Sequence, residues 1–348
     1  MTTRLLHGRF LYLILGSFIV ILYVRIAVVG LGSHADSLPL LPEEHHQAWW
    51  TEPPNPETLR TIALSDRRFG AMVGLLTFVI AGLGLGGVVL TVWGLRTGRL
   101  RLAWRSSSSP PPAWSYAELR RILFLTVAVA LMLPFVRLAA MASQPAWNLD
   151  TNLWITLSML VLDVFVVLAI VAFATGREAR GLSRLGLSSR NLWASVKAGF
   201  VGYTGVFPWL FLLLFSTAEV ARLLGFQPPV EPIHKLIFEE QRTVVLALTA
   251  LLACVVGPIA EEGFFRGVLY AALRQRRSRW LSMLISGTLF SLIHSNPMGF
   301  LPILVLGGLL AYLYEWTGSL AAPIAVHIAH NSLLMGLAMV FRQLAPPG

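Results

Sequence analysis

The stretch from Val244 to Leu273, VVLALTALLACVVGPIAEEGFFRGVLYAAL, decides how this chain is interpreted. It is apolar over a length that exceeds the ~20 residues needed to cross a bilayer as a helix. Near its middle, however, it carries Glu261, Glu262 and Arg266. Each ionised group costs roughly 2.5–3.5 kcal/mol at the centre of a membrane on insertion scales. Three such side chains in one apolar segment therefore indicate a functional site within a membrane.

The composition of the whole chain is that of a membrane protein. Of 348 residues, 56% are hydrophobic and only 13% are charged, whereas soluble domains have about 25% charged residues. The apolar runs are continuous rather than alternating, which favours helices over a β-barrel. We predict an all-α, polytopic helical membrane protein with eight or nine transmembrane helices, near residues 10–30, 71–95, 122–142, 153–174, 198–218, 243–273, 280–294, 299–315 and 319–341.

The net charge of +10 raises the question of a nucleic-acid partner, but its distribution argues against one. Most Lys and Arg side chains fall in alternate connections between the predicted helices, and most acidic residues fall in the others. This is the positive-inside pattern, so the basic residues report membrane orientation. We expect a multi-pass protein of a bacterial plasma membrane with a cytoplasmic N-terminus, in contact with the lipid bilayer. The single cysteine, Cys254, excludes an internal disulfide.

Four regions follow from this pattern. Residues 1–105 are predicted to form an N-terminal transmembrane hairpin with a Pro-rich outside loop at 31–70, and residues 106–121 form a cytoplasmic linker that begins with SSSSPPPA. Residues 122–194 supply two further transmembrane helices. Residues 195–348 hold the polar residues of interest, and within them 219–242 predicts a short interfacial helix leading into the glutamate segment.

The spacing of the charged residues in the glutamate segment suggests a division of roles. Glu262 and Arg266 are i,i+4, so they lie on one helical face and can pair. Glu261 lies about 100° away around the helix and is free to face a cavity, where a carboxylate can act as a general base for water. Pro258 weakens the helix just before the glutamates and frees a backbone carbonyl.

Two later helices add further polar residues. His294 ends the segment 280–294, and His327 and Asn331 share a face of the last helix because they are i,i+4. Counted from the predicted inner end of each helix, Glu261, His294 and His327 fall in a similar central to outer layer. Asp163 is the only ionisable residue in its own predicted helix, and there we favour a helix-packing hydrogen bond or a neutral acid over a proton relay.

Taken together, three ordered motifs resemble those of the CPBP intramembrane proteases, which include the type II CaaX prenyl endopeptidases and the bacterial Abi proteins. The motifs are Glu-Glu-x-x-x-Arg (Glu261, Glu262, Arg266), Phe-x-x-x-His (Phe290, His294) and His-x-x-x-Asn (His327, Asn331). The resemblance covers roughly residues 195–341. It implies an intramembrane endopeptidase that hydrolyses a peptide bond of a membrane-embedded or membrane-associated protein or peptide.

The resemblance also implies roles for the site residues. Glu261 and His294 would activate the water, His327 and Asn331 would form the oxyanion hole, and Glu262 and Arg266 would support them. No cofactor is expected. The alternative is a divalent metal such as zinc, because two histidines and a carboxylate can form a catalytic zinc site. Other functions remain open: a non-proteolytic membrane scaffold or immunity protein, or a proton-coupled carrier that uses the same buried polar residues.

Overall fold

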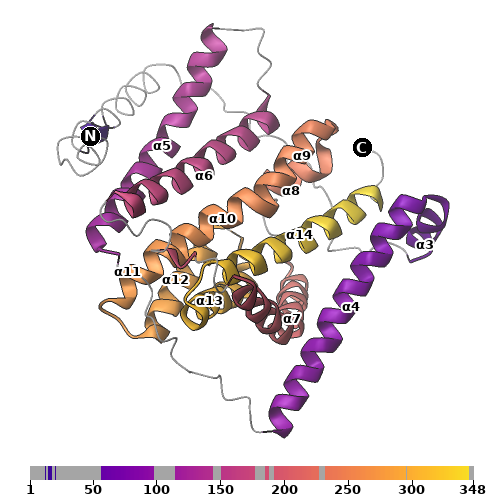
Figure 1. The fold of residues 1–348 in the computed structure, drawn as a ribbon. Helices are drawn as coiled ribbons and strands as arrows, with labels where there is room; N and C mark the ends of the chain where they lie inside the picture. Colours follow the sequence, from indigo (N-terminus) through magenta and orange to yellow (C-terminus); the bar gives the residue numbers. More distant parts are fainter. Residues whose placement is uncertain are drawn as a thin grey trace.

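A computed structural model describes residues 12, 15–17, 20, 56–97, 114–143, 150–176, 185–187, 192–226, 232–294 and 296–344. Within these ranges the ordered elements are helices (Figure 1). They are α3 (Pro56–Ser65), α4 (Arg67–Arg96), α5 (Tyr116–Ser143), α6 (Thr151–Thr175), α7 (Leu192–Leu223), α8 (Pro232–Glu239), α9 (Thr243–Leu251), η3 (Leu252–Val256), α10 (Gly257–Glu262), η4 (Gly263–Tyr270), α11 (Ala271–Arg274), α12 (Arg279–Ile293), α13 (Phe300–Thr317) and α14 (Ala321–Leu344).

The predicted membrane architecture is confirmed. Seven helices in the described part of the chain are long and apolar enough to cross a bilayer, and α12 is a shorter apolar helix of 15 residues. α9 to α11 form a single continuous span, Thr243–Arg274. These eight helices correspond to eight of the nine predicted segments. The remaining segment, 10–30, lies almost entirely outside the described residues, as do loop residues 31–55 and the SSSSPPPA sequence.

Two connections contain more helix than the sequence pattern predicts. α3 lies in the region assigned to loop 31–70, and Asp66 accepts hydrogen bonds from the backbone N–H groups of Arg68 and Phe69 to begin α4. α5 begins at Tyr116, inside the predicted linker 106–121. A capping box explains that start: Ser115 Oγ accepts from the Glu118 N–H, and the Glu118 carboxylate accepts from the Ser115 N–H.

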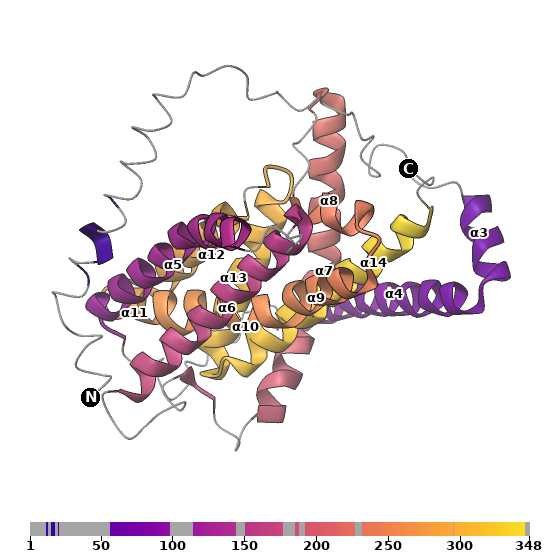
Figure 2. The same cartoon turned by 90° about the horizontal axis from the view of Figure 1, so that it is seen from above.

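The span Thr243–Arg274 carries Glu261 and Glu262 and is called the glutamate span below. It packs between helices that come before it and after it in the sequence. α6 packs against α9, η3, α10 and η4, and α14 packs against η3 and α10. In Figure 1, α6, α10 and α14 follow one another as nearly parallel rods, and Figure 2 shows α4 extending to one side of them. α6 thus belongs to the surroundings of the glutamates, although the sequence pattern assigns it to a separate region, 122–194.

α12 and α13 form a tight pair beside this arrangement. A Cβ added to Gly287 would lie 3.2 Å from the Gly308 nitrogen, and one added to Gly307 would lie 3.1 Å from the Gly287 Cα. Small residues at these positions let the two backbones approach closely, as is common for helix pairs in membranes. The pair brings the Gly307 carbonyl and Phe290 to the edge of the glutamate span.

Charged residues tie several helix ends together at one end of the bundle. Arg242, just before α9, pairs with Asp150 at the start of α6 and with Glu240 at 2.7 Å. Asn152 donates to Glu240 at 3.1 Å, and Arg342 near the end of α14 donates to the Glu240 backbone carbonyl at 2.5 Å. The network links the start of α6, the start of α9 and the end of α14 to one another.

Candidate active site

The span that carries the glutamates is not a regular α-helix. It contains two π-helical segments, η3 and η4, on either side of α10, and π-helical turns are frequent at functional sites. In η3 the Gly257 N–H donates to the Leu252 carbonyl, five residues back. The next donor in this pattern would serve Ala253, but residue 258 is proline and has no N–H. Asn331 of α14 supplies the missing donor, because its Nδ2 donates to the Ala253 carbonyl at 2.8 Å.

Glu262 and Arg266 form a fully buried ion pair. Their N–O distance is 2.7 Å, and neither side chain is exposed. Arg266 also donates to the Gly307 carbonyl at 3.0 Å, and its guanidinium carbon lies 4.4 Å from the centre of the Phe290 ring. Buried charges need this degree of pairing, because an unpaired ion in a low-dielectric interior is strongly destabilising. The pairing predicted from the i,i+4 spacing is thus present.

His327 connects the two glutamates across helices. Its Nδ1–H donates to Glu262 Oε1 at 2.8 Å, and its Nε2 lies 3.7 Å from Glu261 Oε2. The second distance is beyond a direct hydrogen bond. Glu261 Oε2 is buried without a hydrogen-bond partner among the described residues, yet 28% of the Glu261 side chain is exposed. Glu261 is therefore the accessible carboxylate of the pair, whereas Glu262 is fully enclosed.

His294 lies at the end of α12 with one ring nitrogen occupied. Its Nδ1–H donates to the Phe290 carbonyl at 2.7 Å, which leaves the Nε2 lone pair available. Its ring is 4.8 Å from Phe290, and Phe290 in turn is 5.6 Å from the His327 ring, between centroids. No hydrogen bond or ion pair within the described ranges joins His294 to Glu261. The structure thus brings Glu261, Glu262, Arg266 and His327 together. His294 is separated from them by the Phe290 ring.

One residue near the site, Asp163, differs from what the sequence suggests. The Asp163 carboxylate shares no hydrogen bond with any other described residue, so the expected packing hydrogen bond is not found. Instead it lies beside the glutamates: a Cβ on Gly257 would be 3.5 Å from Asp163 Oδ2 and 3.9 Å from Glu261 Oε1. His330 is occupied elsewhere, with its Nδ1 2.9 Å from the Tyr203 hydroxyl. The feature of the sequence that could have pointed to this position of Asp163 is that it is the only ionisable residue of an otherwise apolar helix.

The described residues do not form a ready metal site. No group of three His, Cys, Asp or Glu side chains in these ranges is close enough together to hold a metal ion. A catalytic zinc ion takes three protein ligands and keeps one open position. Glu261 and His327 together supply two donors, and His294 does not join them in this arrangement.

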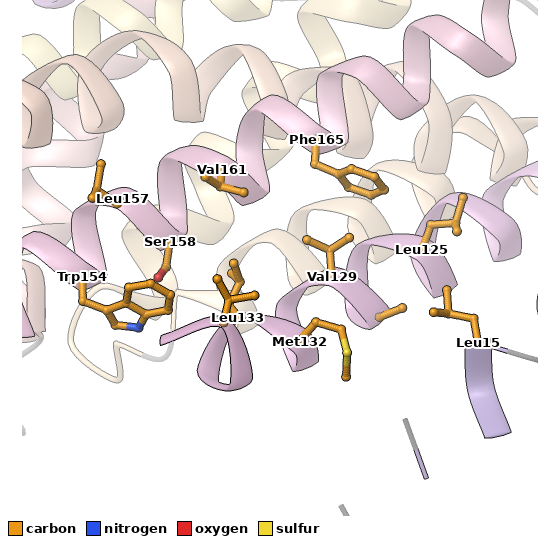
Figure 3. A pocket seen from close by; sticks show the side chains of 12 residues that line it. Leu15, Leu125, Val129, Met132, Leu133, Trp154, Leu157, Ser158, Val161 and Phe165 are labelled. Carbon is orange, nitrogen blue, oxygen red and sulfur yellow. The ribbon is translucent and has the colours of Figure 1, made fainter. Parts of the chain in front are cut away.

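An apolar cavity of about 480 Å³ lies between α5 and α6 (Figure 3). On α6 its lining residues recur at helical spacing, at Trp154, Ser158, Val161 and Phe165. Asp163 lies on the opposite face of the same helix, since successive residues turn by about 100°. α6 therefore separates the cavity from the glutamates, and the cavity is not part of the polar site.

Comparisons with known proteins locate the resemblance in this region. Residues 243–333 match the family model described as type II CAAX prenyl endopeptidase Rce1-like. The putative membrane peptidase YdiL of Bacillus subtilis is 30% identical over 25% of this chain and 36% of its own length. The membrane-embedded CAAX protease MroQ of Staphylococcus aureus is 32% identical over 26% of this chain and 38% of its own length.

A protein of Escherichia coli described as an uncharacterized 24.3 kDa protein is 29% identical over 36% of this chain and 61% of its own length. The chain thus spans between about a third and three fifths of the curated relatives that it matches. No solved structure matches it significantly. Residues 243–333, the stretch that matches the type II CAAX prenyl endopeptidase Rce1-like family, hold Glu261, Glu262, Arg266, His294, His327 and Asn331.

Proposed function

We propose that this protein is an intramembrane endopeptidase that hydrolyses a peptide bond of a membrane-embedded or membrane-associated protein or peptide. One observation carries the proposal most: His327 hydrogen-bonds Glu262 and faces the accessible Glu261. Residues of two separate motifs thereby meet inside apolar helices. The family match and the two relatives named as peptidase and protease support the same activity.

Glu261 is the general base in this proposal. Glu262 is committed to Arg266 and His327, whereas Glu261 is partly exposed and has an unsatisfied oxygen. A water bound to Glu261 would lose its proton to this carboxylate and attack the peptide carbonyl. The free Nε2 of His294 would accept a second hydrogen bond from that water. Catalytic hydrogen bonds are often long before substrate binds, so the present separation of His294 is compatible with this role.

His327 and Asn331 are the proposed oxyanion donors. Glu262 holds the His327 ring through Nδ1, so donation to the oxyanion uses Nε2 and requires the doubly protonated ring. Asn331 uses one amide hydrogen on Ala253 and retains a second for the substrate. Preorganised donors of this kind typically contribute 10²–10³-fold each to the rate.

We propose that no metal ion takes part, and that Glu261 and His294 activate the water without one. The substrate is proposed as a class only, because the CAAX specificity in one relative's name belongs to that protein. We further propose a bacterial plasma-membrane location with a cytoplasmic N-terminus, which rests on the distribution of basic residues.

The test compares host membrane proteomes by N- and C-terminal peptide profiling. Wild type, Glu261→Gln and Glu219→Gln are expressed at equal levels. Glu219 pairs with Arg222 on an exposed surface, with more than half of each side chain exposed, so it is a matched control. Peptide termini that disappear only in Glu261→Gln support proteolysis and identify the substrate. Identical profiles with a folded Glu261→Gln protein would contradict the proposal and favour the scaffold or carrier.

A further inference from the structure

Asp163 is an unexplained charge at the centre of a membrane helix. It is the middle residue of α6, Thr151–Thr175, and the only ionisable residue of that helix. No ion pair or hydrogen bond links it to any other described side chain. An intramembrane carboxylate without a cationic partner is costly and by default indicates function. α6 places it against the span that carries the glutamates.

The neighbour that Asp163 faces is Glu261. Oxygens of both carboxyl groups approach the position that a Cβ on Gly257 would occupy, at 3.5 Å and 3.9 Å. The absence of a side chain at Gly257 leaves the space between them open. Both face the same small volume from different helices.

The cationic side chains around this volume are too few to neutralise both the Asp163 and the Glu261 carboxylates. Among the elements packed against α6, α9 has no ionisable residue and η3 has only Cys254. α10 contributes Glu261 and Glu262, and η4 contributes Arg266, which Glu262 already neutralises. On α5, Arg137 lies at the far end of α6, beside Thr151. His327 reaches Glu261. Asp163 therefore has no cation of its own among the described residues.

We propose that Asp163 and Glu261 share a single proton across Gly257. Two carboxylates that face one space cannot both ionise without a large repulsion, and such pairs retain one proton and titrate as a unit. The exchange is balanced: the proton on Asp163 passes to Glu261, and the negative charge passes the other way. When Asp163 holds the proton, Glu261 is ionised and free to act as base. Asp163 is thus a positioning residue that sets the charge of Glu261, and its catalytic consequence rests on the proposed function.

Infrared spectroscopy tests the shared proton without requiring any activity. Full-length protein in proteoliposomes is titrated while the C=O stretch of protonated carboxylic acids is recorded. The wild type should show a protonated carboxyl near neutral pH that Asp163→Asn lacks. Glu261→Gln should move the titration of the remaining Asp163 carboxyl to lower pH by about one unit or more, as expected for coupled groups. The control is Ser158→Ala, on the opposite face of α6, which should leave the spectrum unchanged.

A band that persists in Asp163→Asn, or an Asp163 titration that ignores Glu261→Gln, would overturn the proposal. Cleavage provides the second readout. Because Asn resembles a protonated Asp, Asp163→Asn should leave Glu261 ionised and keep kcat/KM at neutral pH near or above that of the wild type. Loss of cleavage at neutral pH in a folded Asp163→Asn protein would also contradict proton sharing. If no protein is cleaved by any form, the proposed function fails, and the infrared result still decides the shared proton.

Discussion

Arg266 and Glu262 form an ion pair at 2.7 Å with both side chains completely buried, one helical turn apart in the glutamate span. Removing one partner leaves an uncompensated buried charge, which typically destabilises a protein by about 3–5 kcal/mol. We expect Arg266→Gln to lower the unfolding temperature in detergent strongly. Glu262→Gln in the same protein should recover part of that loss, since it removes the orphaned charge. An unaltered melting temperature for Arg266→Gln would show that this pair does not stabilise the span.

The hydrogen bond from Asn331 to Ala253 leads to a prediction about Pro258. Asn331→Ala leaves a buried carbonyl without a donor, which typically costs about 1–3 kcal/mol. Pro258→Ala restores a backbone N–H close to that carbonyl. We therefore expect Asn331→Ala to destabilise the wild type more than it destabilises Pro258→Ala. Thermal unfolding of the four proteins in this double-mutant cycle measures the difference. Equal losses in both backgrounds would mean that Asn331 does not replace the donor missing at residue 258.

What the sequence could predict here was the local part of the structure. Long apolar runs predict the spans because a helix must satisfy its backbone hydrogen bonds internally in lipid. The Glu262–Arg266 pair follows from i,i+4 spacing, since both residues belong to one helix. Ser115 and Glu118 carried the capping signal for α5, although the Pro-rich composition before them favoured a longer linker.

The relations between helices could not be predicted in the same way. Whether His294 touches Glu261 depends on the rotation of α12, which packing against α13 through Gly287 and Gly307 determines. The proximity of Asp163 to Glu261 depends on how α6 packs against η3 and α10. Sequence spacing carries no information on such a register between distant segments. The π-helical geometry around Ala253 likewise depends on the Asn331 contact from another helix.

The network at Glu240 predicts an acid-sensitive contribution to stability. Hydrogen bonds from Arg242 lower the pKa of Glu240 to about 2, from an ordinary value of 4.5. A carboxyl group whose pKa is lower in the folded state stabilises that state above its unfolded pKa. The contribution should therefore be complete above about pH 4.5 and disappear as the pH falls towards 2. Melting temperatures of wild type and Glu240→Gln should converge over this range. A difference between the two proteins that is independent of pH would contradict the assignment.

Metal removal separates the two mechanisms that the motif residues allow. If Glu261 activates water without a metal, prolonged treatment with a strong chelator should leave the cleavage rate unchanged, whereas Glu261→Gln and His294→Ala should each abolish most of it. The chelated protein is compared with an untreated sample at matched concentration, and both are checked by thermal unfolding to exclude loss of the fold. Cleavage that disappears on chelation and returns with added zinc would contradict the carboxylate mechanism. It would require His294 to move towards Glu261 and His327, because three protein ligands are needed to hold a catalytic zinc ion.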